Sequence, residues 1–307
     1  MSGPEDAVGG SPESAPAKPS VREREGCDTI ERRVAALYGG TSWHASSGLL
    51  HVASIAWPSR RVIAIGPAAP PSETDRFVLG FARARADVVV TTGAILRAEP
   101  ELTHAYAEES GLAAAFAAWR RVTLERERPP RVVVLSASGG LPRDSRALRG
   151  AAECLVWTGR AGARRLAQDG PSGVAIAIDE ALDLEPQQSL ARLLRWLFAE
   201  AGAETVLLEA GATTTSALYS RAGAPEVDEL LLSGFEGPLR SEAEGPPFAS
   251  AAAVERVLGA PRSEAHVDEP SGPWRFQRYR RGARAIRHSE GPSGIRISSS
   301  SSNPWRV

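Results

Sequence analysis

The sequence predicts an α/β fold in which a mainly parallel central sheet is covered by helices on both faces. Short runs rich in β-branched residues alternate with amphipathic stretches along most of the chain. Two of these runs, DVVVTTG (87–93) and RVVVLSASG (131–139), are apolar without alternation, as is typical of strands buried on both faces. With 307 residues, of which 42% are hydrophobic and 24% charged, the chain is long enough for one large core.

One domain is expected over residues 28–281, flanked by two disordered tails. The first tail, residues 1–27, is rich in Pro, Gly, Ser, Ala and Glu over most of its length, and the second, residues 282–307, contains a run of five serines. Such segments bury too little apolar surface to offset the conformational entropy that is lost on ordering.

Five helices are expected within the domain, and capping residues mark several of their ends. Asp28 can cap the first helix, Ser72 or Thr74 the second, and Gly202 and Gly223 follow the last two. The fourth has a leucine stripe at helical spacing, which predicts one buried face. The expected helices are 28–38, 72–86, 100–121, 187–202 and 213–223.

The strands are assigned to the β-branched and apolar runs between these helices. Eight are expected, with two more near the C-terminus: 49–56, 60–65, 87–93, 131–139, 154–158, 173–179, 204–211 and 227–235, then 264–268 and 274–281. The segment 204–209 is expected at the centre of the sheet. The last run, WRFQRYRR (274–281), predicts an edge strand whose outer face carries arginines such as Arg278. RNA binding is the alternative interpretation of this run.

Composition excludes several classes of function. The formal net charge of −1 gives no overall electrostatic grip on nucleic acid or membrane, and no apolar run is long enough to span a bilayer. Two cysteines, Cys27 and Cys154, cannot form a disulfide framework or a cysteine-rich zinc site, so we expect no metal site and a cytoplasmic location. The only lysine, Lys18, precludes a P-loop. Glu99 and its acidic neighbours are interpreted as a solvated helix start.

The segment ETVLLEAGATTTSALYSRAG (204–223) is the most informative one for function. A strand ends at Gly211, and a helix rich in hydroxyl groups begins just after it. The backbone N–H groups of a helix start, together with the hydroxyls of Thr213 and Thr214, suit a phosphate or pyrophosphate. A simple strand-to-helix turn with Ser/Thr capping is the alternative, and the spacing leaves both open.

The order of the segments carries a resemblance to a known family. They are LLHVASIA (49–56), FVLGFARARADVVVTTG (77–93), RAEPELT (97–103), RVVVLSASGGLP (131–142), and VLLEAGATTTSALYSRAG with VDELLL (206–232). In this order they resemble the C-terminal reductase domain of the bacterial bifunctional deaminase-reductase of riboflavin biosynthesis. That domain has a dihydrofolate-reductase-like fold, so the resemblance implies a single dihydrofolate-reductase-like domain here.

The resemblance implies NADPH as cofactor and hydride transfer to an opened ribose, as in 5-amino-6-(5-phosphoribosylamino)uracil reductase, or to a similar carbonyl or imine. It implies a small-molecule substrate, such as a phosphorylated aminopyrimidine, and a possible homodimer through residues 227–234. The implied cofactor-binding residues are Thr92 and Gly93 at the cofactor, Ser136 and Ser138 near the adenosine phosphate, and Glu209, Ala210, Gly211, Thr213 and Thr214 at the pyrophosphate.

Three positions depart from the family pattern on the substrate side. Ala56 stands where the family has an aspartate, and Leu96 where it has a threonine. The arginine that the family has soon after the segment matched by RAEPELT is either replaced by His104 or missing. No catalytic residue is therefore assigned. The alternative function is a non-catalytic nucleotide-binding protein that kept the fold and lost its substrate-side residues.

Overall fold

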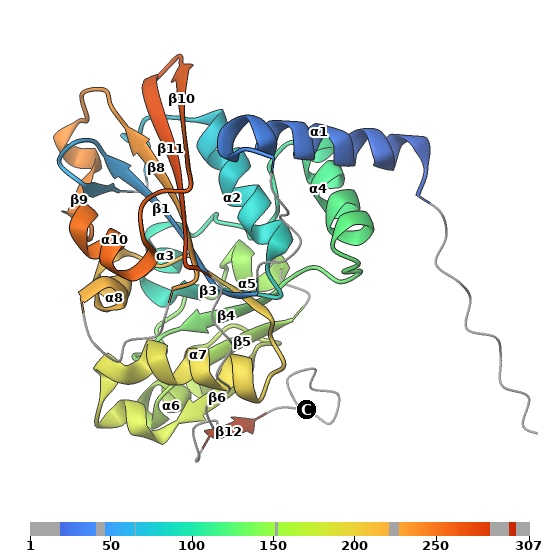
Figure 1. Ribbon diagram of the computed structural model, residues 1–307. Helices are drawn as coiled ribbons and strands as arrows, with labels where there is room; N and C mark the ends of the chain where they lie inside the picture. The colour runs from blue at the N-terminus through green and yellow to red at the C-terminus, as the bar shows by residue number, and fades with distance from the viewer. Residues whose placement is uncertain are drawn as a thin grey trace, which may run out of the picture.

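The computed structural model describes residues 19–40, 47–64, 66–150, 153–220, 227–282 and 295–298. Within these ranges the chain builds one 12-stranded sheet (Figure 1). Its strands are β1 (Gly48–Ala56), β2 (Arg61–Ile63), β3 (Val88–Thr92), β4 (Arg131–Leu135), β5 (Cys154–Thr158), β6 (Ala175–Asp179), β7 (Thr205–Leu208), β8 (Glu229–Phe235), β9 (Glu244–Pro247), β10 (Ser263–Glu269), β11 (Gly272–Arg280) and β12 (Ile295–Ser298).

The centre of the sheet is parallel, as the sequence predicts. The strand order is β10-β11-β8-β1-β7-β3-β4-β5-β6-β12, and β2 and β9 branch from β1. Every pairing from β8 to β6 is parallel, whereas β11, β10 and β12 join antiparallel. β7 lies between β1 and β3, so segment 204–209 takes the predicted central position. The prediction of an α/β fold with a mainly parallel sheet is thus confirmed.

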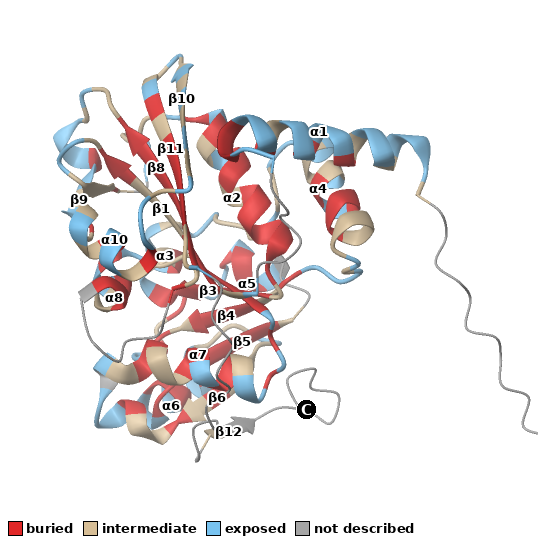
Figure 2. Cartoon of the chain, viewed as in Figure 1, coloured by how far each residue is buried: buried red, intermediate tan, exposed pale blue. Residues whose placement is uncertain are grey.

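Helices cover both faces of this sheet. The α-helices are α1 (Val21–Tyr38), α2 (Glu73–Arg85), α3 (Gly93–Ala98), α4 (Ser110–Thr123), α5 (Arg146–Gly150), α6 (Arg160–Asp169), α7 (Ser189–Ala199), α8 (Ala212–Thr215), α9 (Ala217–Ser220) and α10 (Ala251–Leu258), and the 3-10 helices are η1 (Glu180–Asp183), η2 (Pro186–Gln188) and η3 (Ser241–Ala243). α7, α9 and α10 share one apolar core, and α1, α2 and α4 form another with the opposite faces of β3, β7 and β8. Buried residues accordingly run along the central strands and the inner helix faces (Figure 2).

The first helix begins earlier than predicted, at Val21 rather than at residue 28. Ser20 caps it: its hydroxyl accepts from the Glu23 N–H, and the Glu23 carboxylate accepts from the Ser20 N–H at 2.7 Å. This capping box explains why Asp28 lies inside the helix and why residues 21–27 belong to the fold. The rest of the predicted N-terminal tail, residues 1–18, lies outside the described residues.

Two other predicted helices are interrupted. The segment 100–121 holds only part of a helix, because α3 ends at Ala98 and α4 starts at Ser110. Pro100 disfavours helical backbone at Glu99, which ends α3 with an extended φ of −129°. The predicted helix 213–223 consists of the four-residue helices α8 and α9, and its expected end at Gly223 is not among the described residues.

The C-terminal tail contributes one strand that the sequence did not predict. β12 pairs antiparallel with the outer edge of β6, with Ile295 opposite Asp179. Residues 283–294 and 299–307 of the predicted tail lie outside the description. Within the described ranges, no helix combines the length and the apolar character needed to cross a bilayer.

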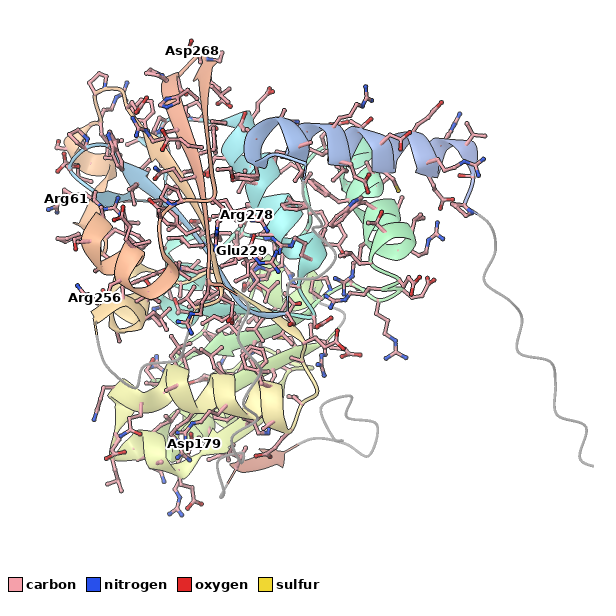
Figure 3. The ribbon with its side chains drawn as sticks, viewed as in Figure 1. Arg61, Asp179, Glu229, Arg256, Asp268 and Arg278 are labelled. Carbon is pink, nitrogen blue, oxygen red and sulfur yellow. The ribbon has the colours of Figure 1, made fainter. Side chains whose placement is uncertain are left out.

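An ion triad is buried where β8 pairs with β11. Glu229 accepts from Arg85 at 2.8 Å and from Arg278 at 2.8 Å, and all three side chains are at most 4% exposed (Figure 3). The prediction that Arg278 lies on an outer face is wrong, because β11 lies inside the sheet and β10 forms the edge. β8 is likewise internal, with all seven of its residues buried. The homodimer through residues 227–234 that the resemblance implied stays a prediction.

Acid should weaken this triad. Burial alone would raise the pKa of Glu229, but the guanidinium groups of Arg85 and Arg278 outweigh it and lower the pKa from about 4.5 to about 2. A carboxyl whose pKa is lower in the folded state stabilises the fold above its unfolded pKa and loses this contribution as pH falls through the folded value. We expect the free energy of unfolding in urea to decrease as pH falls from 4.5 to 2. A flat profile over this window would contradict the lowered pKa.

Candidate functional site

The carboxyl ends of β3, β4 and β7 meet at one edge of the sheet. Val90 pairs with Leu208 and Thr92 with Leu135, so the three strands end at similar levels along the strand direction. The residues that follow them are therefore neighbours at this edge. In open α/β sheets, ligands bind outside this carboxyl edge. It is here that the structure gathers most of the predicted cofactor-binding residues.

Thr92, Gly93 and Ser136 are buried together at this edge. The Thr92 hydroxyl accepts from the Ile95 N–H at 3.3 Å and so caps α3. A Cβ at Gly93 would lie 2.8 Å from Ser136 Oγ and 2.9 Å from a Leu141 methyl carbon. Gly93 is therefore needed for packing between α3 and the loop after β4. The pairing of Gly93 with Ser136 follows from the fold, whereas their contact with a cofactor stays a prediction.

Glu209 directs its carboxylate towards α2. Arg83 Nε and Nη2 donate to its two oxygens at 2.7 and 2.8 Å, and His104 Nδ1 lies 3.7 Å from Oε2. Burial would raise the pKa of Glu209, but the Arg83 guanidinium outweighs it and holds the pKa well below its ordinary value. Because its side chain is bound by Arg83, Glu209 fixes the turn that leads to Ala210 and Gly211.

Gly211 is the most open of the predicted positions. It caps α8 with φ −64° and ψ 161°, is exposed, and has no atom within 4 Å of the place where a Cβ would stand. Thr213 is also exposed, Thr214 is half-buried, and the Thr214 N–H donates to the Gly211 carbonyl at 2.9 Å. Within the first turn, only the N–H groups of Ala212 and Thr213 precede these hydrogen bonds and are available for an anion. The four-residue length of α8 gives a smaller dipole than the predicted longer helix.

Sequence reasoning missed Glu99, which lies at the C-terminal end of α3. The interpretation of Glu99 as part of a solvated helix start is wrong: the residue is half-buried, and its Oε1 is buried without a hydrogen bond from any described residue. Burial raises the pKa of this carboxyl, and Glu209 nearby raises it further while Arg83 lowers it. The signal in the sequence was the position of Glu99, which follows the predicted strand 87–93 by a short turn and directly precedes Pro100.

The substrate-side positions are apolar, as the departures from the family pattern indicated. Ala56 is 5% exposed and Leu96 is fully buried. A different carboxylate approaches this part of β1: Ser54 Oγ donates to both oxygens of Asp75, on α2, at 2.9 and 3.0 Å. Burial raises the pKa of Asp75, although hydrogen bonds from Ser233 and Ser54 oppose the rise. No sequence pattern signalled that α2 would bring an acid to Ser54.

Ser138 lies apart from the other predicted residues. It belongs to the loop after β4 and lines a pocket of about 320 Å³ between α3 and α6. Its hydroxyl accepts from the Gly140 N–H at 3.3 Å. The two serines implied near the adenosine phosphate therefore have different environments. Ser136 is buried, whereas Ser138 lines the pocket.

Comparison with known proteins gives one family match and several structural likenesses. The family model of the RibD C-terminal domain matches residues 35–233. No curated protein sequence matches the chain. Among solved structures, a pyrimidine reductase-like protein from Corynebacterium diphtheriae is 19% identical, with a TM-score of 0.51, over 81% of this chain and 98% of its own.

Two further structures have a similar fold. Riboflavin biosynthesis reductase Rib7 from Saccharomyces cerevisiae is 13% identical with a TM-score of 0.50, over 82% of this chain and 99% of its own. RibD from Acinetobacter baumannii is 19% identical with a TM-score of 0.50, and the match covers 76% of this chain but only 57% of RibD. At these identities the likeness is one of fold.

Proposed function

The chain belongs to the family of RibD C-terminal domains, and from this premise we propose that it is a reductase that uses NADPH. Its proposed substrate is a phosphorylated aminopyrimidine with an opened ribose, such as 5-amino-6-(5-phosphoribosylamino)uracil, or a related carbonyl or imine. A nicotinamide cofactor, when bound, supplies the hydride. The tasks left to this chain are to hold the nucleotide, orient the substrate and deliver a proton.

The open turn at Gly211 is the observation that carries the proposal. Gly211 is exposed, and no atom lies within 4 Å of the place where its Cβ would be. It lies next to the exposed Thr213 in the first turn of α8. Glu209, held by Arg83, keeps this turn at the carboxyl edge of β7. Backbone N–H groups and threonine hydroxyls that converge without a competing acceptor suit a pyrophosphate. These residues fit the cofactor that the family implies.

Two acids at the same sheet edge are candidates for the proton donor. Reduction of a carbonyl or imine adds a proton to its oxygen or nitrogen, and a donor works best when its pKa lies near the working pH. Burial raises the pKa of both Glu99 and Asp75. We propose Glu99 for this role, because its Oε1 has no hydrogen bond from the described residues, whereas serine hydroxyls bind Asp75.

The rate of cofactor oxidation should therefore fall as pH rises through the pKa of Glu99, since only the protonated acid donates. Glu99→Gln should remove this dependence, and Asp75→Asn should retain it. The measurement is the pH profile of kcat for wild type and both variants. If kcat of Glu99→Gln falls with rising pH as it does in wild type, another group donates the proton.

The function itself is tested with purified protein, NADPH and NADH. Binding is followed by nucleotide fluorescence. Turnover is followed by loss of nicotinamide absorbance after addition of 5-amino-6-(5-phosphoribosylamino)uracil. Oxidation of NADPH supports the reductase. Binding without oxidation supports the non-catalytic alternative, which the apolar Ala56 and Leu96 favour. Absence of both binding and oxidation would contradict both functions.

A further inference from the structure

Arg60 lies in the turn between β1 and β2 and has an unusual backbone conformation. Its φ is +56°, a left-handed value that a residue with a side chain adopts only at a cost in energy. The Arg60 N–H donates to the Ala56 carbonyl at 2.8 Å, and the Arg60 carbonyl accepts from the Phe248 N–H at 2.7 Å. Arg60 Nε donates to the Ala249 carbonyl at 2.9 Å. The fold therefore fixes both the backbone of Arg60 and the position of its guanidinium.

Both terminal nitrogens of this guanidinium are buried and unsatisfied. Nη1 and Nη2 are closed to solvent and donate to no atom of the described residues. Burial lowers the pKa of Arg60, and it outweighs Tyr279, Glu255 and Tyr219, which favour the charged form from a longer distance. Arginine nonetheless stays protonated in proteins, so this positive charge is held in the interior without an acceptor at its terminal nitrogens. A buried charge that lacks a partner destabilises the fold, and an anion would offset this cost.

A second unsatisfied polar group lies on the side of β1 that faces α9 and α10. His51 is 1% exposed, its Nδ1 lies 2.7 Å from the Tyr219 hydroxyl, and its Nε2 is buried with no partner among the described residues. Burial lowers the pKa of His51 to about 3, so the imidazole is neutral at pH 7 and carries one N–H. The tautomer that accepts from Tyr219 has this N–H at Nε2. His51 and Arg60 both pack against Phe248, whose ring centroid lies 5.9 Å from the imidazole centroid and 5.8 Å from Arg60 Cζ.

We propose that Arg60 binds a small monovalent anion, such as chloride, on this side of β1. Nη1 and Nη2 supply charged donors, and the rings of Trp57 and Phe248, with centroids 5.7 and 5.8 Å from Cζ, give surroundings of low polarity in which an ionic contact is strong. Because both nitrogens are closed to solvent, the ligand has to lose its water shell, which costs a monovalent ion less than a dianion such as phosphate. Arg60 and His51 take no part in the proposed cofactor site, so the anion site and the reductase can be tested separately.

The test titrates chloride against gluconate at constant ionic strength and follows the melting temperature of the full chain. The variant is Arg60→Met, which keeps most of the bulk of the side chain and removes its charge. Arg61→Met is the matched control, because Arg61 is the next residue and its side chain, 40% exposed, pairs with the equally exposed Glu244. Anomalous scattering from crystals grown in bromide locates the ion directly.

Chloride should raise the melting temperature of wild type and of Arg61→Met by about 5 °C and leave that of Arg60→Met unchanged. Without chloride, Arg60→Met should melt at or above the temperature of wild type, because it removes a buried charge that has no partner. A bromide peak should lie within hydrogen-bond distance of Arg60 Nη1 or Nη2. The proposal is overturned if wild type and Arg60→Met respond equally to chloride, or if no bromide peak lies beside Arg60. If Arg60→Met does not fold, the bromide peak in wild type decides alone.

Discussion

Gly211→Val is expected to weaken NADPH binding about 100-fold while the protein stays folded. The branched side chain would occupy the free space beside the first turn of α8, where we place the pyrophosphate. Two or more charge-assisted hydrogen bonds would be lost, each worth about 1.5–3 kcal/mol. The folded state should tolerate the change, because φ at Gly211 is −64° and no atom lies within 4 Å of the new Cβ.

One companion variant, Thr213→Ala, makes this result specific. Thr213→Ala should cost only about 1 kcal/mol of binding, as one neutral hydroxyl among several donors. Gly93→Val is unsuitable for blocking the nicotinamide end, because its side chain would strike Ser136 and Leu141 and disturb the fold. Nucleotide fluorescence gives the dissociation constants. If Gly211→Val melts like wild type and binds NADPH equally well, the pyrophosphate lies elsewhere.

Glu229→Ala is expected to lower the free energy of unfolding by about 3–5 kcal/mol. The substitution would leave the guanidiniums of Arg85 and Arg278 in the core without their shared carboxylate. A buried charge that loses its partner retains the full cost of desolvation. Urea unfolding at pH 7 measures the change.

The control is Glu101→Ala, because the Arg146–Glu101 pair has side chains that are 57% and 80% exposed. Exposed pairs contribute about 0–1 kcal/mol, so this variant should unfold close to wild type. Arg278→Ala should lower the free energy of unfolding by less than Glu229→Ala does, because Arg85 still pairs with the Glu229 carboxylate. Equal stability of Glu229→Ala and Glu101→Ala would contradict the importance of the triad.

The central sheet could be predicted because its strands carry a local signal. β3 is buried on both faces and lies close to its predicted bounds of 87–93, whereas β4 and β7 end at Leu135 and Leu208, earlier than predicted. α2 begins after Ser72, one of the two predicted caps. α1 was placed too late because Asp28 and Ser20 are both good caps, and the reciprocal Glu23 was overlooked.

The charged residues were harder, because their roles depend on partners distant in sequence. Arg278 was assigned to an outer face, yet its side chain is buried and pairs with Glu229, 49 residues away, which also binds Arg85 of α2. Glu99 seemed solvated in its local context, but the fold buries it near Arg83 and Glu209. The open turn at Gly211 was accessible to sequence reasoning, since a strand, a glycine and a hydroxyl-rich helix start are contiguous.

The strand β12 has a consequence for the behaviour of the protein in concentrated solution. An uncovered sheet edge offers free backbone groups to the strands of other molecules and so promotes aggregation. At one edge, β10 exposes Glu264, His266 and Asp268, whose polarity discourages such pairing. Asp268 is labelled on this strand in Figure 3. At the other edge, the apolar β6 is covered by residues 295–298 of the same chain. Shortening the chain at residue 282 would leave the carboxyl edge of β3, β4 and β7 untouched but uncover Ala175–Asp179, so we expect solubility to fall before cofactor binding does.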